Sequence, residues 1–166
     1  MKKLLFLFTV SIALISCGED VRFNNQAVFQ GVKDNIFWQG SDAKAILGTN
    51  KLKFQAVSLT ETMVLEIPIP STSIDPKNEN TFATYVLGTS TNKKASFVTT
   101  IADEVYEYQT GVQGDAGEVV VSQYDGVTVS GTFRFNAKNI DPNSAGNEFV
   151  NMQNGVFYKV PVTPEL

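Results

Sequence analysis

Few side chains in this sequence could carry out acid–base or nucleophilic chemistry at neutral pH. The 166 residues include no histidine and one cysteine, Cys17. Without histidine, the Ser-His-Asp and Cys-His arrangements of hydrolases cannot be built. One cysteine forms neither an intrachain disulfide nor a cysteine-based structural zinc site. Catalysis would therefore depend on carboxylates or hydroxyls, and the sequence predicts a protein that is not an enzyme and takes no cofactor.

The acidic side chains are the candidates for a hydrolase, because glycoside hydrolysis uses a pair of carboxylates. Asp103, Glu104 and Glu107 form the densest acidic group. Asp103 and Glu104 are typical of a turn, while Glu107 alternates with Tyr106 and Tyr108 along an expected strand, so ordinary surface positions account for all three. The acidic residues expected inside strands are Glu66, Glu107 and Glu118. A carboxylate-dependent glycan hydrolase remains the alternative function.

Aromatic side chains offer a second kind of site. The rings of Trp38, Tyr106 and Tyr108, together with Tyr124, could form a ligand-stacking platform for a sugar. A lone tryptophan in a β domain is also often part of the core. Both interpretations stay open at this level.

One loop has some features of a calcium site. The segment from Asp141 to Gly146 resembles the first half of an EF-hand loop, but Ala145 and Met152 stand where oxygen ligands are required. A looser calcium site would use the four residues Asp141, Asn143, Asn147 and Glu148. Ordinary loop chemistry explains the same residues, because Asp and Asn side chains hydrogen-bond to the nearby backbone. We predict no other metal site.

The first residues have the features of a targeting segment. Lys2 and Lys3 precede an apolar run at 4–14, which is too short to span a bilayer. Residues 14–17 (LISC) resemble the bacterial lipobox, which implies cleavage between Ser16 and Cys17 and attachment of lipid to Cys17. We therefore expect a signal peptide at 1–16, a lipidated cysteine and tether at 17–25, and one β domain at 26–166.

The expected partners follow from this anchor and from the charge. The lipid on Cys17 implies attachment to the outer membrane. Glu19 and Asp20 resemble a surface-export signal or form a solvated tether, which favours the cell-surface face over the periplasmic one. Thirteen basic against seventeen acidic side chains disfavour a nucleic-acid partner. Whether the partner is a protein or a glycan stays open.

The rest of the chain favours strands. Valine, threonine and phenylalanine are abundant, and strand patterns recur about every ten residues, as in sandwiches and barrels. We predict an all-β domain: a single antiparallel β-sandwich or flattened barrel of about 9–11 strands, with a lipocalin-like closed barrel as the alternative. Asp125-Gly126 predicts a hairpin with a type I′ turn, and Asn154-Gly155 predicts a second hairpin.

Several segments together resemble a known family. They are residues 29–38 (FQGVKDNIFW), 84–88 (TYVLG), 117–135 (GEVVVSQYDGVTVSGTFRF) and 154–162 (NGVFYKVPV). They are similar to small, functionally uncharacterised Bacteroidota lipoproteins that share a domain of unknown function. The resemblance implies an exported all-β fold and no particular activity. We therefore expect a lipid-anchored β domain with a binding or structural role, the alternatives being the hydrolase and a lipocalin-like carrier of a small ligand.

Overall fold

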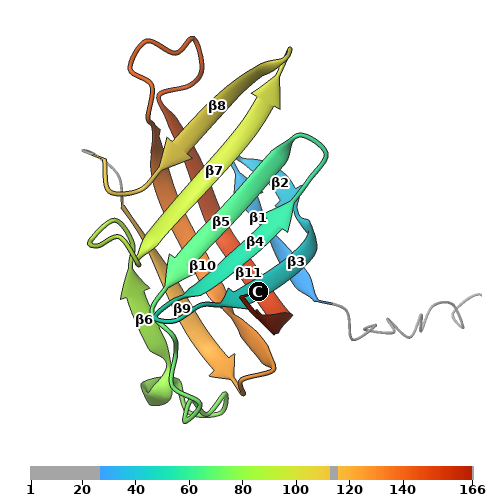
Figure 1. Cartoon of the computed structure of the whole chain (residues 1–166), viewed down its shortest axis with the longest axis vertical. Coiled ribbons are helices and arrows are strands. Elements are labelled where there is room, and N and C mark those ends of the chain that lie inside the picture. Colours follow the sequence, from blue (N-terminus) through green and yellow to red (C-terminus); the bar gives the residue numbers. More distant parts are fainter. Residues whose placement is uncertain (1–26, 113–115, 166) are drawn as a thin grey trace, which may run out of the picture.

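The computed structural model describes residues 27–112 and 116–165, and these are mostly strand (Figure 1). The eleven strands are β1 (Val28–Lys33), β2 (Ile36–Gln39), β3 (Ser41–Leu47), β4 (Leu52–Val57), β5 (Glu61–Ile67), β6 (Ala83–Val86), β7 (Lys94–Ile101), β8 (Glu104–Gln109), β9 (Ala116–Tyr124), β10 (Thr128–Asn139) and β11 (Phe149–Pro164). The helical structure in the described part of the chain is one 3₁₀ turn, η2 (Glu79–Thr81). The prediction of an all-β domain of 9–11 strands is confirmed. None of the described helices is long and apolar enough to cross a membrane.

All eleven strands belong to one sheet, in the order β2-β1-β11-β3-β4-β5-β7-β8-β10-β9-β6. Strand β10 also pairs with β11, so the seven strands from β11 through β3 to β10 close into a ring. The pairs β1–β2 and β9–β6 extend from this ring. The pairings are antiparallel except between β11 and β3, which run parallel. The fold is thus a flattened barrel with a mixed sheet.

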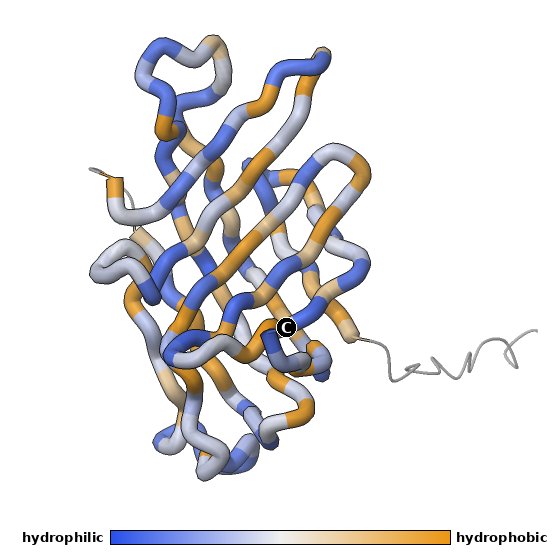
Figure 2. Tube along the Cα trace, viewed as in Figure 1, coloured by the Kyte–Doolittle hydropathy of each residue, from blue (hydrophilic) through white to orange (hydrophobic). Residues whose placement is uncertain are grey.

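Alternation along each strand builds the core. Hydrophobic and polar residues alternate on most strands (Figure 2), so one set of side chains points into the ring. Six inward phenylalanines are at most 3% exposed: Phe29, Phe54, Phe97, Phe133, Phe135 and Phe157. The ring centroids of Phe54 and Phe157 lie 4.8 Å apart, and those of Phe29 and Phe133 lie 5.0 Å apart. Burying each such side chain contributes roughly 1.5–3 kcal/mol, so these rings are a main source of stability.

The hairpin turns differ in part from the prediction. Two turns have a positive φ at both central residues, Asp34-Asn35 and Ala102-Asp103, as type I′ hairpins require. At Asp125-Gly126 only Gly126 has a positive φ, of 83°, so the type I′ prediction there is wrong. The Asp125 carboxylate instead accepts hydrogen bonds from the backbone N–H groups of Val127 and Thr128, at 2.8 and 2.6 Å. These bonds hold Asp125 in a different turn.

The second predicted hairpin does not form. Strand β11 continues through Asn154-Gly155, and its register with β1 and β10 shifts there. Asn154 has a φ of 51°, so the pair makes a β-bulge instead of a turn. A Cβ on Gly155 would lie 2.5 Å from the Phe133 carbonyl oxygen. The bulge bends β11, which pairs with β10 on one side and with β1 and then β3 on the other.

Candidate functional site

Four turns gather at one end of the barrel, which we call the mouth end and define as residues 33–37, 58–61, 99–107 and 138–148. They are the β1–β2, β4–β5 and β7–β8 turns and the loop between β10 and β11, in the upper part of Figure 1. A cleft of about 410 Å³ lies between them. It is lined by Lys33, Asp34, Thr60, Glu61, Thr99, Ile101, Tyr106, Tyr108, Ala145, Gly146, Asn147 and Val150.

Strand alternation explains why this cleft is polar. Met63 and Phe97 point into the ring and are fully buried, so Glu61 and Thr99, two residues nearer the mouth, point the same way. Lys33 on β1 follows inward-facing Phe29 and Gly31 in the same manner. The inward positions therefore change from apolar to polar where the core ends. This polar layer forms the floor of the cleft.

An ion pair between Lys33 and Glu61 occupies the centre of the floor. Their side chains are 23% and 14% exposed, and the Lys33 ammonium lies 5.3 Å from the Phe97 ring centroid. The Trp38 indole N–H donates to Glu61 Oε2 at 2.7 Å, and the Ser58 hydroxyl lies 3.4 Å from the same oxygen. Because both carboxylate oxygens accept bonds, this glutamate is held in one orientation.

The predicted stacking aromatics separate into two groups. Tyr106 and Tyr108 line the cleft, whereas Trp38 is only 5% exposed and lies under the floor with its indole on Glu61. Trp38 therefore presents no ring face to a ligand. Tyr124, also 5% exposed, ends β9 at the opposite end of the barrel.

The two tyrosines of the cleft have perturbed hydroxyls. The Tyr106 hydroxyl donates to Glu104 Oε2 at 2.6 Å, and this bond raises the pKa of Tyr106. Burial raises the pKa of Tyr108, and the nearby charge of Asp34 adds to the effect. The backbone of Gly146 packs against Tyr106, where a Cβ would lie 2.5 Å from ring atom Cδ1. Both hydroxyls are therefore neutral at physiological pH.

Exposed apolar side chains lie on the same turns as the cleft. The described residues expose eleven large hydrophobic side chains, and six of these belong to the mouth end. They are Ile36 (69% exposed), Phe37 (64%), Leu59 (105%), Ile101 (60%), Val105 (61%) and Ile140 (44%). Clustered exposed apolar side chains mark interaction sites more often than scattered ones do.

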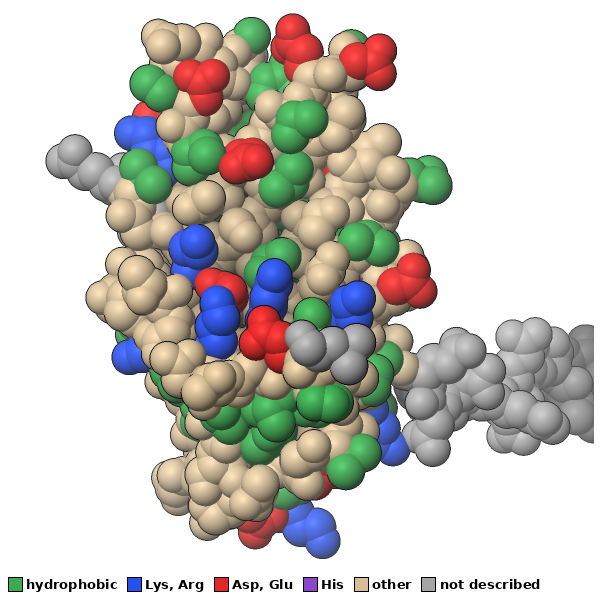
Figure 3. Space-filling model, in the orientation of Figure 1, with side chains coloured by type: hydrophobic (Ala, Val, Ile, Leu, Met, Phe, Trp, Pro, Cys, Tyr) green, Lys and Arg blue, Asp and Glu red, His purple; other side chains and the backbone are tan. Residues whose placement is uncertain are grey.

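The mouth end is also strongly acidic. Its seven acidic residues are Asp34, Glu61, Asp103, Glu104, Glu107, Asp141 and Glu148, and its two basic residues are Lys33 and Lys138. Figure 3 shows acidic side chains over the upper end of this face and basic ones mainly below them. The mouth end thus has an excess of five negative charges, whereas the whole chain has a net charge of −4.

The predicted calcium loop belongs to this end, and its polar groups bond locally. Asp141 Oδ1 accepts from the backbone N–H of Asn143 at 2.9 Å, and Glu148 forms an ion pair of 3.6 Å with Lys138. The Asn147 carbonyl accepts from the Asn139 amide at 3.3 Å. Within the described ranges, no group of three or more His, Cys, Asp or Glu side chains could hold a metal ion. These bonds match ordinary loop chemistry.

The strand acids do not converge on one site. Glu66 accepts from Lys51 at 2.7 Å and Glu118 from Arg134 at 2.9 Å, whereas Glu107 lies opposite Val98. The three glutamates belong to β5, β9 and β8, and none of them lines the mouth cleft. This arrangement provides no carboxylate pair of the kind that glycoside hydrolysis uses.

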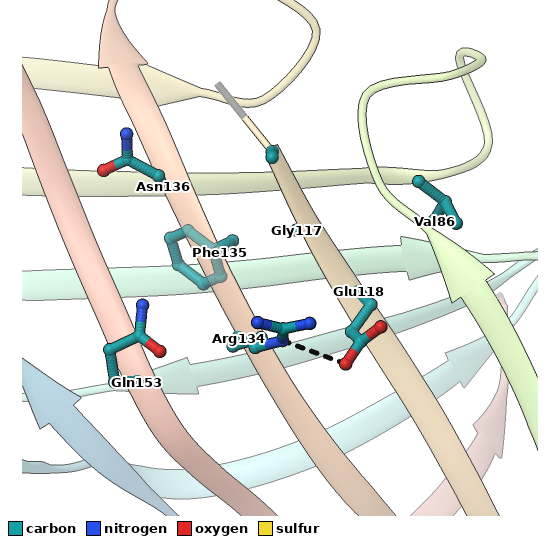
Figure 4. Close-up of a pocket in the computed structure, with 8 residues that line it drawn as sticks. Val86, Gly117, Glu118, Arg134, Phe135, Asn136 and Gln153 are labelled. Atoms are coloured by element: carbon teal, nitrogen blue, oxygen red, sulfur yellow. Dashed lines mark hydrogen bonds and ion pairs between the residues drawn. The ribbon is translucent and has the colours of Figure 1, made fainter. Parts of the chain in front are cut away.

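A smaller groove of about 330 Å³ lies along β9 and β10 (Figure 4). Its centre is the ion pair between Arg134 and Glu118, whose side chains are 63% and 34% exposed. Gly117 opens the groove beside Phe135, because a Cβ there would lie 2.7 Å from Phe135 Cβ. Exposed ion pairs of this kind contribute about 0–1 kcal/mol. We therefore regard the mouth as the better candidate site.

The predicted anchor lies elsewhere in the chain. Ser16, Cys17, Glu19 and Asp20 are outside the described residues.

Sequence reasoning missed Lys33 and Glu61 as site residues. The sequence did offer a signal for both: each is a charged residue at an inward-facing strand position, Lys33 just before a turn and Glu61 just after one.

Comparison with known proteins adds a family. A family model described as a domain of unknown function, DUF6252, matches residues 25–161. No curated protein and no solved structure matches the chain.

Proposed function

We propose that this chain, which belongs to the DUF6252 family of domains of unknown function, is a non-enzymatic binding module that docks a protein partner at its mouth end. In this proposal it is a lipoprotein of a Bacteroidota outer membrane, anchored by lipid on Cys17. The observation that carries the proposal is the coincidence of six exposed apolar side chains, an acidic surface and a cleft at one end of the barrel.

The partner is expected to be apolar and basic at its contact surface. Exposed tips such as Leu59 and Phe37 gain free energy when a partner removes them from water. The surrounding carboxylates raise the association rate of a positively charged partner and disfavour an acidic one. A sugar would prefer several flat exposed aromatic faces, and two of the predicted stacking residues, Trp38 and Tyr108, are at most 5% exposed. A protein surface therefore fits this end better than a glycan.

The direction of β1 is consistent with an anchored module. Strand β1 ends at the mouth with Lys33 and begins at Val28, about 17 Å away at the usual rise of a strand. A tether leading to Val28 would therefore join the domain away from the mouth. A lipid on Cys17 would leave the mouth free to face a partner.

Photo-crosslinking in cells that express the full-length chain tests the proposal. A benzophenone amino acid replaces Ile36 at the mouth or Val127 in the β9–β10 turn at the other end; both side chains are 69% exposed. We expect one discrete, protease-sensitive adduct from position 36, weakened by Glu104→Lys, and none from position 127.

Three outcomes would contradict the proposal. Equal adducts from both positions would show contact without a preferred end. No adduct from position 36 would remove the mouth as the binding surface. An adduct that resists protease and is removed by periodate would make the partner a glycan.

A further inference from the structure

A second charged surface lies on the side of the barrel, and we call it the lysine face. It consists of Lys44, Lys51, Lys53, Lys93 and Lys94 on β3, β4 and β7 and at their ends. Figure 3 shows basic side chains gathered across the middle of this side. The chain is acidic overall, with a sequence pI of about 4.8, so five neighbouring lysines are unexpected.

Strand register shows that four of these lysines are neighbours, and Lys93 directly precedes one of them, Lys94. Lys53 pairs with Glu66, and Glu66 pairs with Lys94, so the three side chains form one row across β4, β5 and β7. Lys51 precedes this row on the same side of β4 and bonds to Glu66 at 2.7 Å. Lys44 lies one row further, opposite Gln55. Neighbouring strands are about 5 Å apart, so Lys53 and Lys94 lie about 10 Å apart in this row, on either side of Glu66.

The alternation of side chains along each strand places this row on the outside of the barrel. The neighbours Leu52, Phe54 and Ala95 are fully buried, so Lys53 and Lys94 point to solvent. Three carboxylates accompany the five ammonium groups: Glu66 within the row, Glu165 beside the β3–β4 turn, and Asp42 two residues before Lys44 on β3. The lysine face thus keeps a local excess of positive charge.

We infer that the lysine face binds the anionic phosphate headgroups of a membrane surface. The five charges spread over β3, β4 and β7, and none of the five lysines lines either cleft described above, which suits a broad charged surface better than one small anion. Lysine is a compact point charge without the fixed two-pronged geometry of arginine. Four or more clustered lysines are typical of surfaces that bind anionic lipids.

This contact would complement an anchor and is independent of the partner proposed at the mouth. One acyl anchor together with a basic patch holds a protein on a membrane more firmly than either alone. The acidic mouth end is repelled by the same headgroups. The two surfaces together would therefore turn the mouth away from the membrane.

Vesicle partitioning of the chain 18–166, without lipid, tests this inference. All eleven strands and the whole core lie within 28–164, so this chain keeps every element of the fold. We expect the wild type to bind phosphatidylcholine vesicles that contain phosphatidylglycerol and not pure phosphatidylcholine. Raising the salt from about 0.05 M to about 0.5 M should release it, because the Debye length shortens several-fold.

Two double variants locate the contact. Lys53→Gln with Lys94→Gln should weaken partitioning onto the anionic vesicles about 30-fold, since each lysine near the surface is worth about fivefold. The control, Lys77→Gln with Arg134→Gln, removes the same charge away from both the lysine face and the mouth end and should change it much less. Equal urea midpoints for the two doubles would verify that both are folded.

Several results would overturn the inference. They are equal binding to neutral and anionic vesicles, no binding to the anionic vesicles, and equal losses in the two doubles. Binding to soluble dextran sulfate that depends on Lys53 and Lys94, without binding to vesicles, would make the ligand an anionic polysaccharide. None of these outcomes alters the crosslinking result at Ile36, so the two proposals fail separately.

Discussion

The ion pair at the mouth predicts a loss of stability that follows from its depth. Glu61→Gln removes the negative charge and keeps the side-chain size, so the Lys33 ammonium stays above Phe97 without a counterion. Breaking a buried pair by removing one partner costs about 3–5 kcal/mol, whereas an exposed pair contributes about 0.2–1 kcal/mol. The two side chains are 23% and 14% exposed, between these limits but nearer the buried one. We therefore expect Glu61→Gln to lower the free energy of unfolding by about 1–3 kcal/mol.

Urea unfolding of the chain 18–166, followed by circular dichroism, measures this loss. With a slope of about 2 kcal/mol per M, a loss of about 2 kcal/mol lowers the midpoint by about 1 M. The matched control is Glu118→Gln, which breaks the exposed pair with Arg134 and should shift the midpoint much less. Adding Lys33→Met to Glu61→Gln should recover part of the loss, because no unpaired charge remains. A shift for Glu61→Gln no larger than the control, or no recovery in the double variant, would refute the reasoning.

Three further predictions concern the bulge, the β9–β10 turn and the anchor. Gly155→Ala should destabilise the fold by roughly 1–3 kcal/mol, because its Cβ would overlap Phe133; an unchanged melting temperature would show that the bulge relaxes freely. Backbone hydrogen bonds from Thr128 and Val127 lower the pKa of Asp125 below its usual 3.8. The ionised Asp125 carboxylate therefore stabilises the fold above pH 3.8, and this stabilisation is lost as the pH falls through the lowered pKa of the folded state. In Asp125→Asn the urea midpoint should therefore fall less steeply than in the wild type as the pH is lowered below 3.8. The same pH dependence in both proteins would contradict this. A palmitate analogue should label the full-length wild type and not Cys17→Ser, and equal labelling of both would end the proposal of a lipid on Cys17.

The β9–β10 hairpin shows which features can be predicted from the local sequence. The alternation of Val129, Phe133 and Phe135 with polar residues predicted an inward and an outward face, and these three side chains are at most 3% exposed. Asp125-Gly126 predicted the place of the turn but not its geometry. The Asp125 carboxylate selected another turn through two backbone hydrogen bonds, which compete with the type I′ form.

Asn154-Gly155 shows where local sequence fails. The same dipeptide chemistry that favours a tight turn also favours a bulge, because both place a residue at positive φ. The neighbouring strands select the bulge over the turn. Strand β10 pairs with one edge of β11 across this point, and β1 pairs with the other edge. Those partners come from distant parts of the chain, so no window around Asn154 contains them.

The sequence by itself determined the fold class, the alternating core and the absence of histidine from any site, because these depend on composition and on the period of two along each strand. It also determined that Tyr106 and Tyr108 share one strand face. Only the tertiary structure decided that Lys33 and Glu61 meet over Phe97, that Trp38 lies beneath them, and that the exposed apolar side chains share one end of the barrel with a cleft. These residues are separated by tens of positions, and closing the sheet into a ring brings their strand ends to the same edge.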